Sequence, residues 1–288
     1  MIEDTLIRCA YQKDFSIAAG EVNWTEKFDP LESLITKVEK QSVDISNHFI
    51  IENPATVSEA YELKKIIGDD ATAVKGNFMF VNTGTIDRYE NLWGQFKTQY
   101  IKGFYDYPYV PKEKLKKSFP RRYEQTISEK LILAGMIKRI EAMYDSGKIV
   151  AGKSTLIIMN KTKSYSLKYL LALINSKLFS TIYQSKFKYS SMAGGYLNVS
   201  KGNLSKMPFK ELSLSDNAQK AQYEHILVLV QQTLGAKEKL STAKTDRDKT
   251  YYENRCTDID RQIDRVVYNL YGLTEEQIST VEGNHLIG

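Results

Sequence analysis

Residues 147–154 (GKIVAGKS) match the pattern GxxxxGK[ST], in which glycine-rich backbone and a lysine bind nucleotide phosphates. Such a loop needs a strand before it and a helix after it, because the amide groups at the helix start point at the phosphate. The sequence indicates the opposite order: apolar spacing predicts a helix over residues 128–144, and the run Thr155–Met159 predicts a strand. We therefore interpret Lys153 as a basic group at a strand edge, and a P-loop hydrolase is kept only as an alternative.

Two further catalytic patterns begin but are not completed. Asn53-Pro54 opens the tetrapeptide of adenine methyltransferases, yet the aromatic residue that stacks on a flipped base is missing. Glu62-Leu63-Lys64 has the ExK form of metal-dependent nucleases, but no carboxylate follows at strand spacing to share a metal ion. We expect no catalytic residue in this chain, and a degenerate nuclease is the second enzymatic alternative.

Metal-binding and disulfide patterns are missing as well. Cys9 and Cys256 lie far apart, and the three histidines, at positions 48, 225 and 285, are isolated from one another. This spacing excludes a disulfide scaffold and argues against a zinc site. No apolar run approaches the ~20 residues of a membrane helix, and the acidic residues 1–4 are not followed by a signal-peptide core. We expect a cytoplasmic protein without metal or membrane partner.

The charge is divided unevenly along the chain. Residues 97–210 hold 22 lysine and arginine against 6 aspartate and glutamate residues, a net charge of +16, so the remaining residues carry −11 of the overall +5. The same window holds eleven of the nineteen tyrosines. Cations interleaved with aromatic rings suit a polyphosphate whose bases offer flat faces, so the pattern favours nucleic acid. A solvated lysine surface on an ordinary enzyme is the alternative.

Two kinds of contact to duplex DNA are expected within this window. Cations would neutralise phosphates and fix the position of the protein without reading sequence; the candidates are Lys116, Lys117, Arg121, Arg122, Lys138, Arg139, Lys153, Lys161 and Lys163. The segment before Gly194-Gly195 mixes donors, hydroxyls and an aromatic ring, which suits contact with base edges; the candidates are Lys186, Lys188, Tyr189, Ser190 and Met192.

The pattern of apolar residues predicts an α+β fold, with a mixed body followed by helices. Strands are predicted at residues 49–51, 78–81 and 155–159, and helices at 31–38, 128–144 and 166–183. From position 216 onward the pattern is helical, with predicted helices at 216–240 and 246–271 forming an antiparallel pair. We predict a lead-in with a connecting helix (1–45), a globular body with a β-sheet core (46–212) and a helical spacer or docking region (213–288).

Several segments resemble the target recognition domains of restriction-modification specificity proteins, in particular the TaqI-like C-terminal specificity domain of type II/IIG enzymes. The segments are Phe80–Ile86, Lys153–Thr155, Tyr169–Phe179 (YLLALINSKLF), Gly194–Val199 (GGYLNV), Leu204–Pro208 (LSKMP) and Ile263–Glu276. Together they cover roughly residues 30–283. The resemblance also extends to half of a type I specificity subunit, in which a globular recognition domain is joined to helices that dock a methyltransferase.

The resemblance implies sequence-specific binding of double-stranded DNA in a restriction-modification system. In such enzymes the domain is joined to an adenine-N6 methyltransferase, often with an endonuclease, and this chain lacks those catalytic domains. The resemblance therefore implies a methyltransferase/endonuclease domain or subunit as partner. It also implies that S-adenosylmethionine and Mg²⁺ belong to that partner, with no cofactor in this chain. A helical protein-interaction adaptor with an incidental basic surface is the alternative from another functional class.

Overall fold

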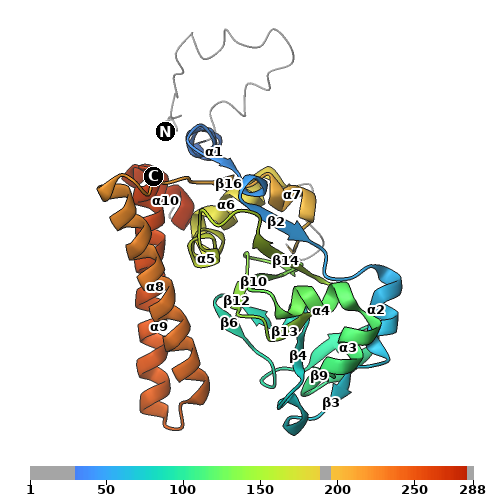
Figure 1. Cartoon of the computed structure of the whole chain (residues 1–288). Helices are drawn as coiled ribbons and strands as arrows, with labels where there is room; N and C mark the ends of the chain where they lie inside the picture. The colour runs from blue at the N-terminus through green and yellow to red at the C-terminus, as the bar shows by residue number, and fades with distance from the viewer. Residues whose placement is uncertain (1–29, 189–195, 284–288) are drawn as a thin grey trace, which may run out of the picture.

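The computed structural model describes residues 30–188 and 196–283. Figure 1 shows a body of strands and short helices beside two long helices, α8 (Asn217–Thr242) and α9 (Asp246–Leu270), which pack along their length. The turn between them spans only residues 243–245, so the helices run antiparallel. The predicted α+β class with a C-terminal helical pair is confirmed.

The central sheet has the strand order β12-β10-β14-β2, and every neighbouring pair in it is antiparallel. Its strands are β2 (Phe49–Glu52), β10 (Lys130–Ala134), β12 (Ala142–Asp145) and β14 (Thr155–Asn160). The predicted strands at 49–51 and 155–159 are therefore confirmed. The predicted helix over 128–144 is wrong, because that stretch forms β10 and β12. A short, wholly buried run such as Lys130–Ala134 has no polar face, so its periodicity cannot separate strand from helix.

A second sheet of order β13-β4-β9-β3 lies next to the first. It contains β3 (Gly68–Asp69), β4 (Phe78–Val81), β9 (Pro108–Val110) and β13 (Ile149–Ala151), with β13 parallel to β4. Short helices α2 (Val57–Lys64), α3 (Lys112–Ser118) and α4 (Pro120–Ile127) enclose its own core around Phe80 and Leu115. The GxxxxGKS match thus lies between strands β12 and β14. The prediction of a helix before this match is wrong, whereas the prediction of a strand after it is confirmed. Because no helix directly follows the match, the order of elements does not support a P-loop.

Four two-stranded pairs complete the body. They are β1 (Val43–Asp44) with β16 (Pro208–Phe209), β5 (Ile86–Asp87) with β6 (Glu90–Asn91), β7 (Thr98–Tyr100) with β8 (Gly103–Tyr105), and β11 (Met136–Ile137) with β15 (Leu197–Asn198). Single turns of 3₁₀ helix, at Ile45–Asn47, Thr72–Val74 and Thr83–Thr85, connect some of these strands. Each pair is too short to be stable alone, so its geometry depends on the sheets that it borders.

The segment predicted as one helix over 166–183 is two helices, α5 (Leu167–Asn175) and α6 (Lys177–Lys186). Ser176 between them is extended, and its Oγ accepts a hydrogen bond from the amide of Phe179 at 3.2 Å, which caps α6. The Asn175 side chain pairs with both backbone groups of Ala142, at 3.0 and 2.9 Å, and so ties α5 to the edge of the central sheet. The polar pair Asn175-Ser176 is the signal for this break.

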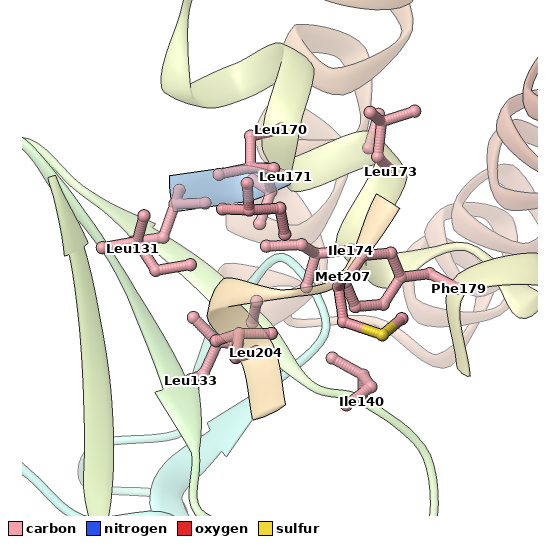
Figure 2. Close-up of a cluster of buried hydrophobic side chains, with 14 of the residues drawn as sticks. Leu131, Leu133, Ile140, Leu170, Leu171, Leu173, Ile174, Phe179, Leu204 and Met207 are labelled. Carbon is pink, nitrogen blue, oxygen red and sulfur yellow. The ribbon is translucent and has the colours of Figure 1, made fainter. Parts of the chain in front are cut away.

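One hydrophobic cluster connects the central sheet with the helices at both ends of the described chain. Figure 2 shows leucines of β10 facing α5, with Leu204 of α7 (Lys201–Ser205) and Met207 beside them. The cluster extends from Leu34 of α1 (Pro30–Glu39) to Val281 of α10 (Glu275–Glu282), and α1 packs on α10. The division into segments 1–45, 46–212 and 213–288 stays a prediction, because its boundaries cross this shared core.

A network of charged groups attaches the helical pair to the body. Arg88, in the turn between β5 and β6, binds Asp260 of α9 with both guanidinium Nη atoms, one of them 2.7 Å from Oδ2. Arg88 Nε also donates to the carbonyl of Asn175 at 3.0 Å. Burial raises the pKa of Asp264, one turn further along α9, to about 6. Burial, reinforced by the negative charge of Asp87, raises the pKa of Glu141 to about 7. We call these residues the Arg88 network.

A buried ion pair joins β10 to the edge strand β12 of the central sheet. Lys130 of β10 and Asp145 of β12 form an ion pair, and their side chains are 1% and 2% exposed. Lys130 Nζ also donates to the Thr126 carbonyl at 2.9 Å. Asp145 accepts hydrogen bonds from the amides of residues 147, 148 and 149 at 2.9–3.2 Å. The carboxylate therefore has donors besides the lysine, whereas the lysine has no other counter-charge.

We predict that the two partners of this pair respond unequally to substitution. Asp145→Ala leaves a buried ammonium without a counter-ion and should lower the free energy of unfolding by about 3–5 kcal/mol. Lys130→Met should cost less, because the three backbone donors still hold the carboxylate. Urea denaturation of both variants measures the difference, and an equal or inverted ranking would contradict this account.

The raised pKa of Glu141 predicts a pH-dependent stability. The folded protein holds this proton more tightly than the unfolded chain, so the contribution of Glu141 to stability is lost as the pH rises from 5 through about 7 to 8. Glu141→Gln should therefore stabilise the protein more at pH 8 than at pH 5, by about 1 kcal/mol for a partly solvated group. Glu253→Gln, at an exposed position of α9, serves as control, and identical pH profiles for wild type and Glu141→Gln would refute the expectation.

Candidate nucleic-acid interface

Four loops of the body meet around Gly135 and Ser154. They are the turn after β4 (Asn82–Gly84), the bend at Gly135 after β10, the turn between β13 and β14 (Gly152–Ser154), and residues 196–199 around β15. We call this set the loop cluster. Its members are distant in sequence, so only the pairing of the two sheets brings them together.

Hydrogen bonds fix the loops of the cluster to one another. The Ser154 carbonyl accepts from the amide of Gly135 at 3.1 Å and from the hydroxyl of Thr83. The Ser154 amide donates to Asn82 Oδ1 at 3.3 Å, and the amide of Val199 donates to the Gly135 carbonyl at 2.9 Å. Two of these four contacts join backbone to backbone, and the other two use the side chains of Thr83 and Asn82, so the shape of the cluster does not depend on its exposed side chains.

Two glycines of the cluster are required by close packing. A Cβ atom at Gly135 would lie 2.3 Å from the Ser154 carbonyl oxygen, and one at Gly152 would lie 2.6 Å from Asn82 Oδ1. Both distances are shorter than any real contact, so larger residues would force the loops apart. These glycines act by allowing the backbones to approach, without a need for positive φ.

The surface of the cluster combines charged, polar and apolar groups. Its exposed side chains are Lys153, Ser154, Met136, Lys138, Tyr196, Asn198 and, in the adjoining helix α7, Lys201. Lys138 Nζ lies 5.2 Å from the centroid of the Tyr196 ring, a cation–π contact. Ammonium groups can neutralise phosphates, and amide, hydroxyl and methyl groups can contact base edges. The surface therefore has the chemistry needed to grip and to discriminate a nucleic acid.

The structure brings only two of the predicted cations, Lys138 and Lys153, to this cluster. Lys161 and Lys163 follow the other end of β14, beside His48 and Ser46. The six residues of β14 separate the two ends by roughly 20 Å at about 3.3 Å per residue. Lys161 and Lys163 are exposed, but they do not extend the surface that carries Lys153.

The predicted basic run around Phe119-Pro120 lies on α3 and α4 rather than in the loop cluster. Lys116, Lys117 and Arg121 are exposed; Arg121 pairs with Glu52 at 2.9 Å while remaining 68% exposed. Arg122 is different: it is buried and binds Glu59 at 3.0 Å. The amide of Thr56, assisted by Arg122, lowers the pKa of Glu59 to about 2. We assign Arg122 a structural role in joining α4 to α2.

Other predicted cations also have partners within the fold. Arg139 is half-buried and donates to the Asn175 carbonyl at 3.1 Å, and burial, with the nearby charge of Arg88, lowers its pKa. Lys186 forms an ion pair with Glu39 of α1. Lys188 is exposed at the end of the described segment. The predicted base-contacting residues Tyr189, Ser190 and Met192 lie outside the described residues.

Part of the loop cluster was not predicted as a site from the sequence. Met136 and Lys201 were not among the candidates, and Tyr196 and Asn198 entered only through the resemblance. The available signal was Gly135 inside an apolar run, because an isolated glycine in a strand pattern indicates a close approach of backbones.

The described residues meet neither the requirements of a metal site nor those of a membrane helix. Within residues 30–188 and 196–283, no three His, Cys, Asp or Glu side chains are arranged to hold a metal ion. No helix in those ranges is both long and apolar enough to cross a bilayer. The surface of the loop cluster presents single hydroxyl and amide groups, and these do not make up the ligand set of a metal ion.

Together, the fold and the surface define a mixed α+β domain that carries the loop cluster and an attached helical pair. More particularly, residues 81–209 match the family model described as the TaqI-like C-terminal specificity domain. The resemblance inferred from the sequence is therefore confirmed over this segment, which is somewhat less than half of the chain. No curated protein matches the chain.

Two solved structures align with most of the chain. The type IIG restriction endonuclease BpuSI aligns over 84% of this chain and 33% of its own, with 9% identity and a TM-score of 0.47. The type IIL restriction-modification enzyme MmeI, solved in complex with DNA, aligns over 84% of this chain and 34% of its own, with 11% identity and a TM-score of 0.36. The chain spans about a third of the length of each structure.

We predict that Gly135→Ala will lower the free energy of unfolding by about 1–3 kcal/mol, because the new methyl group collides with the Ser154 carbonyl. Gly202→Ala is the matched control: a Cβ there meets nothing within 4 Å, and alanine favours the helix in which this residue lies. Thermal or urea denaturation of both variants provides the measurement. Equal stability of the two would show that the loops are not held as tightly as described.

Proposed function

We propose that this chain binds double-stranded DNA and reads its sequence as the specificity domain of a restriction-modification system. One observation carries the proposal: the loop cluster, from Asn82 to Val199, lies entirely within the segment that matches a specificity domain. These hydrogen-bonded surface loops are therefore in the part of the chain that matches the family model.

The composition of the cluster supports DNA as the ligand. Lys138 and Lys153 would contact phosphates, which supplies affinity and orientation but no sequence information. Asn198, Ser154 and Met136 would face base edges, where hydrogen bonds and apolar contacts distinguish base pairs. Lys116, Lys117 and Arg121, on α3 and α4, are further cations of the proposed DNA-binding body.

We assign catalysis to a partner rather than to this chain. A methyltransferase/endonuclease domain or subunit would bring S-adenosylmethionine and Mg²⁺, since the described residues contain no cluster that fits a metal ion. In this proposal segment 46–212 contacts DNA and segment 213–288 forms a helical spacer or docking region. The Arg88 network, which holds α9 against the body, would keep the two at a fixed relative orientation.

Salt-dependent DNA binding tests the proposal. The double variant Lys138→Ala/Lys153→Ala should bind duplex DNA about tenfold more weakly, and the slope of log affinity against log salt should fall by about 2, one for each lost phosphate contact. Lys163→Ala, an exposed lysine at the opposite end of β14, is the matched control and should change neither quantity.

Fluorescence anisotropy with labelled duplexes across a salt series provides both numbers. Wild-type protein that does not bind duplex DNA would overturn the proposal. An equal loss in the Lys163→Ala control would show general electrostatic attraction instead of a defined interface. Retention of all DNA binding by the double variant would show that Lys138 and Lys153 are not part of the DNA interface.

A further inference from the structure

The hairpin of β7 and β8 is a short two-stranded ribbon with an unusual turn. Tyr100 pairs with Gly103, so only Ile101 and Lys102 form the loop. Their φ angles are +42° and +59°, the left-handed region that a two-residue hairpin turn requires and that asparagine and glycine normally occupy. A β-branched residue there is strained, so the surrounding contacts must hold the turn.

The inner face of this hairpin packs against the body. Thr98 and Tyr100 are 1% and 2% exposed, and the Tyr100 ring lies edge-on to Phe80 of β4 with 4.7 Å between centroids. Asn82 Nδ2 donates to the Gln99 carbonyl at 2.8 Å, which fixes β7 to the loop cluster. Lys64 Nζ donates to the Ile101 carbonyl at 2.6 Å and fixes the tip. The ribbon is therefore held at both ends.

The outer face of the ribbon presents an amide beside an aromatic ring. Gln99 and Phe104 are direct cross-strand partners, so their side chains stand next to each other on the exposed face. Phe104 is 64% exposed, more than any other large hydrophobic side chain of the described segments. The Gln99 carboxamide makes no hydrogen bond to any residue within those segments. Folding uses neither side chain.

The charges around this pair suit a polyanion. Lys102 is exposed at the tip, and Lys97, two residues before Gln99 on the same face, lies 3.5 Å from Asp106 while staying 66% exposed. Lys153 of the loop cluster follows Gly152, which packs against Phe80 and Asn82 beneath the hairpin. The ribbon is thus continuous with the surface proposed to bind DNA.

We propose that Gln99 and Phe104 together read one A·T base pair in the major groove; this inference rests on the proposed function. The major groove admits a two-stranded ribbon. A glutamine carboxamide matches the N6 donor and N7 acceptor of adenine, and a phenyl ring makes apolar contact with the thymine methyl group. Both features lie on the same groove edge of one A·T pair, and both side chains lie side by side on one ribbon face.

Selection of bound sites from random duplexes provides the first test. The wild-type site should contain an A·T pair at a position whose preference disappears in Gln99→Ala and in Phe104→Ala, while preferences at other positions persist. Gln262→Ala and Tyr251→Ala are matched controls, because both residues are exposed on α9 and Tyr251 is 61% exposed. The controls should select the wild-type site.

Atomic substitution in the selected site provides the second test. Deoxyuridine in place of thymidine removes the methyl group, and 7-deazaadenine removes N7; each should weaken wild-type binding about 5-fold or more. Phe104→Ala should be insensitive to deoxyuridine and still sensitive to 7-deazaadenine. Gln99→Ala should show the reverse. Thermal denaturation of each variant, expected to match wild type, confirms that the surface changes leave the fold intact.

The outcomes separate this inference from the function on which it depends. Wild-type protein that selects no sequence would overturn both. Sequence selection that survives intact in Gln99→Ala and Phe104→Ala would overturn only the assignment of these two residues. Loss of binding to a methyltransferase subunit in Phe104→Ala, with DNA preference unchanged, would show that the ring docks protein and would likewise overturn it.

Discussion

The carbonyl oxygen of Ser154 is the contact on which the candidate interface depends. It receives the amide of Gly135 from the central sheet and the hydroxyl of Thr83 from the second sheet, so one acceptor joins two separately built layers. This arrangement is possible only because position 135 has no Cβ. The loops are tied through backbone groups and through the side chains of Thr83 and Asn82, so exposed residues such as Lys153 and Asn198 are not needed for these ties. The exposed side chains can therefore be replaced while the backbone of the loop cluster keeps its shape.

The C-terminal helices are the elements whose bounds the sequence predicts best. The bounds of α8 and α9 follow from apolar spacing, and a capping box of Thr274 and Gln277 stands at the start of α10. Long amphipathic helices carry their periodicity over many turns, which makes the signal strong. Short buried strands carry no such periodicity, and for that reason residues 128–144 were wrongly predicted to form a helix. The break at Ser176 was missed because the apolar spacing continues across it while the backbone does not.

The candidate site could be predicted only in part, because a run of charged residues does not reveal which side chains point to solvent and which point into the protein. Arg122 belongs to a basic run yet points inward to Glu59, whereas its neighbour Arg121 points to solvent. Lys153 and Lys163 are ten positions apart and come to lie at opposite ends of one strand. Which cations share a face is decided by sheet pairing between remote segments, and no local pattern records it. The hairpin face that carries Gln99 and Phe104 escaped notice because it lies in a turn-rich stretch with weak alternation.

The pairing of β1 with β16 has a consequence for how such a molecule can change. Val43 lies opposite Phe209, so the chain enters and leaves the body through two strands that are paired with each other. The segment between β1 and β16 can be exchanged as one unit, because only its two junctions with the rest of the chain must match. The condition is that an incoming segment must keep the surface of α5 and α6 that rests on α8 and α9. New binding preferences could thus arise by transplantation, while the helical frame stays unchanged.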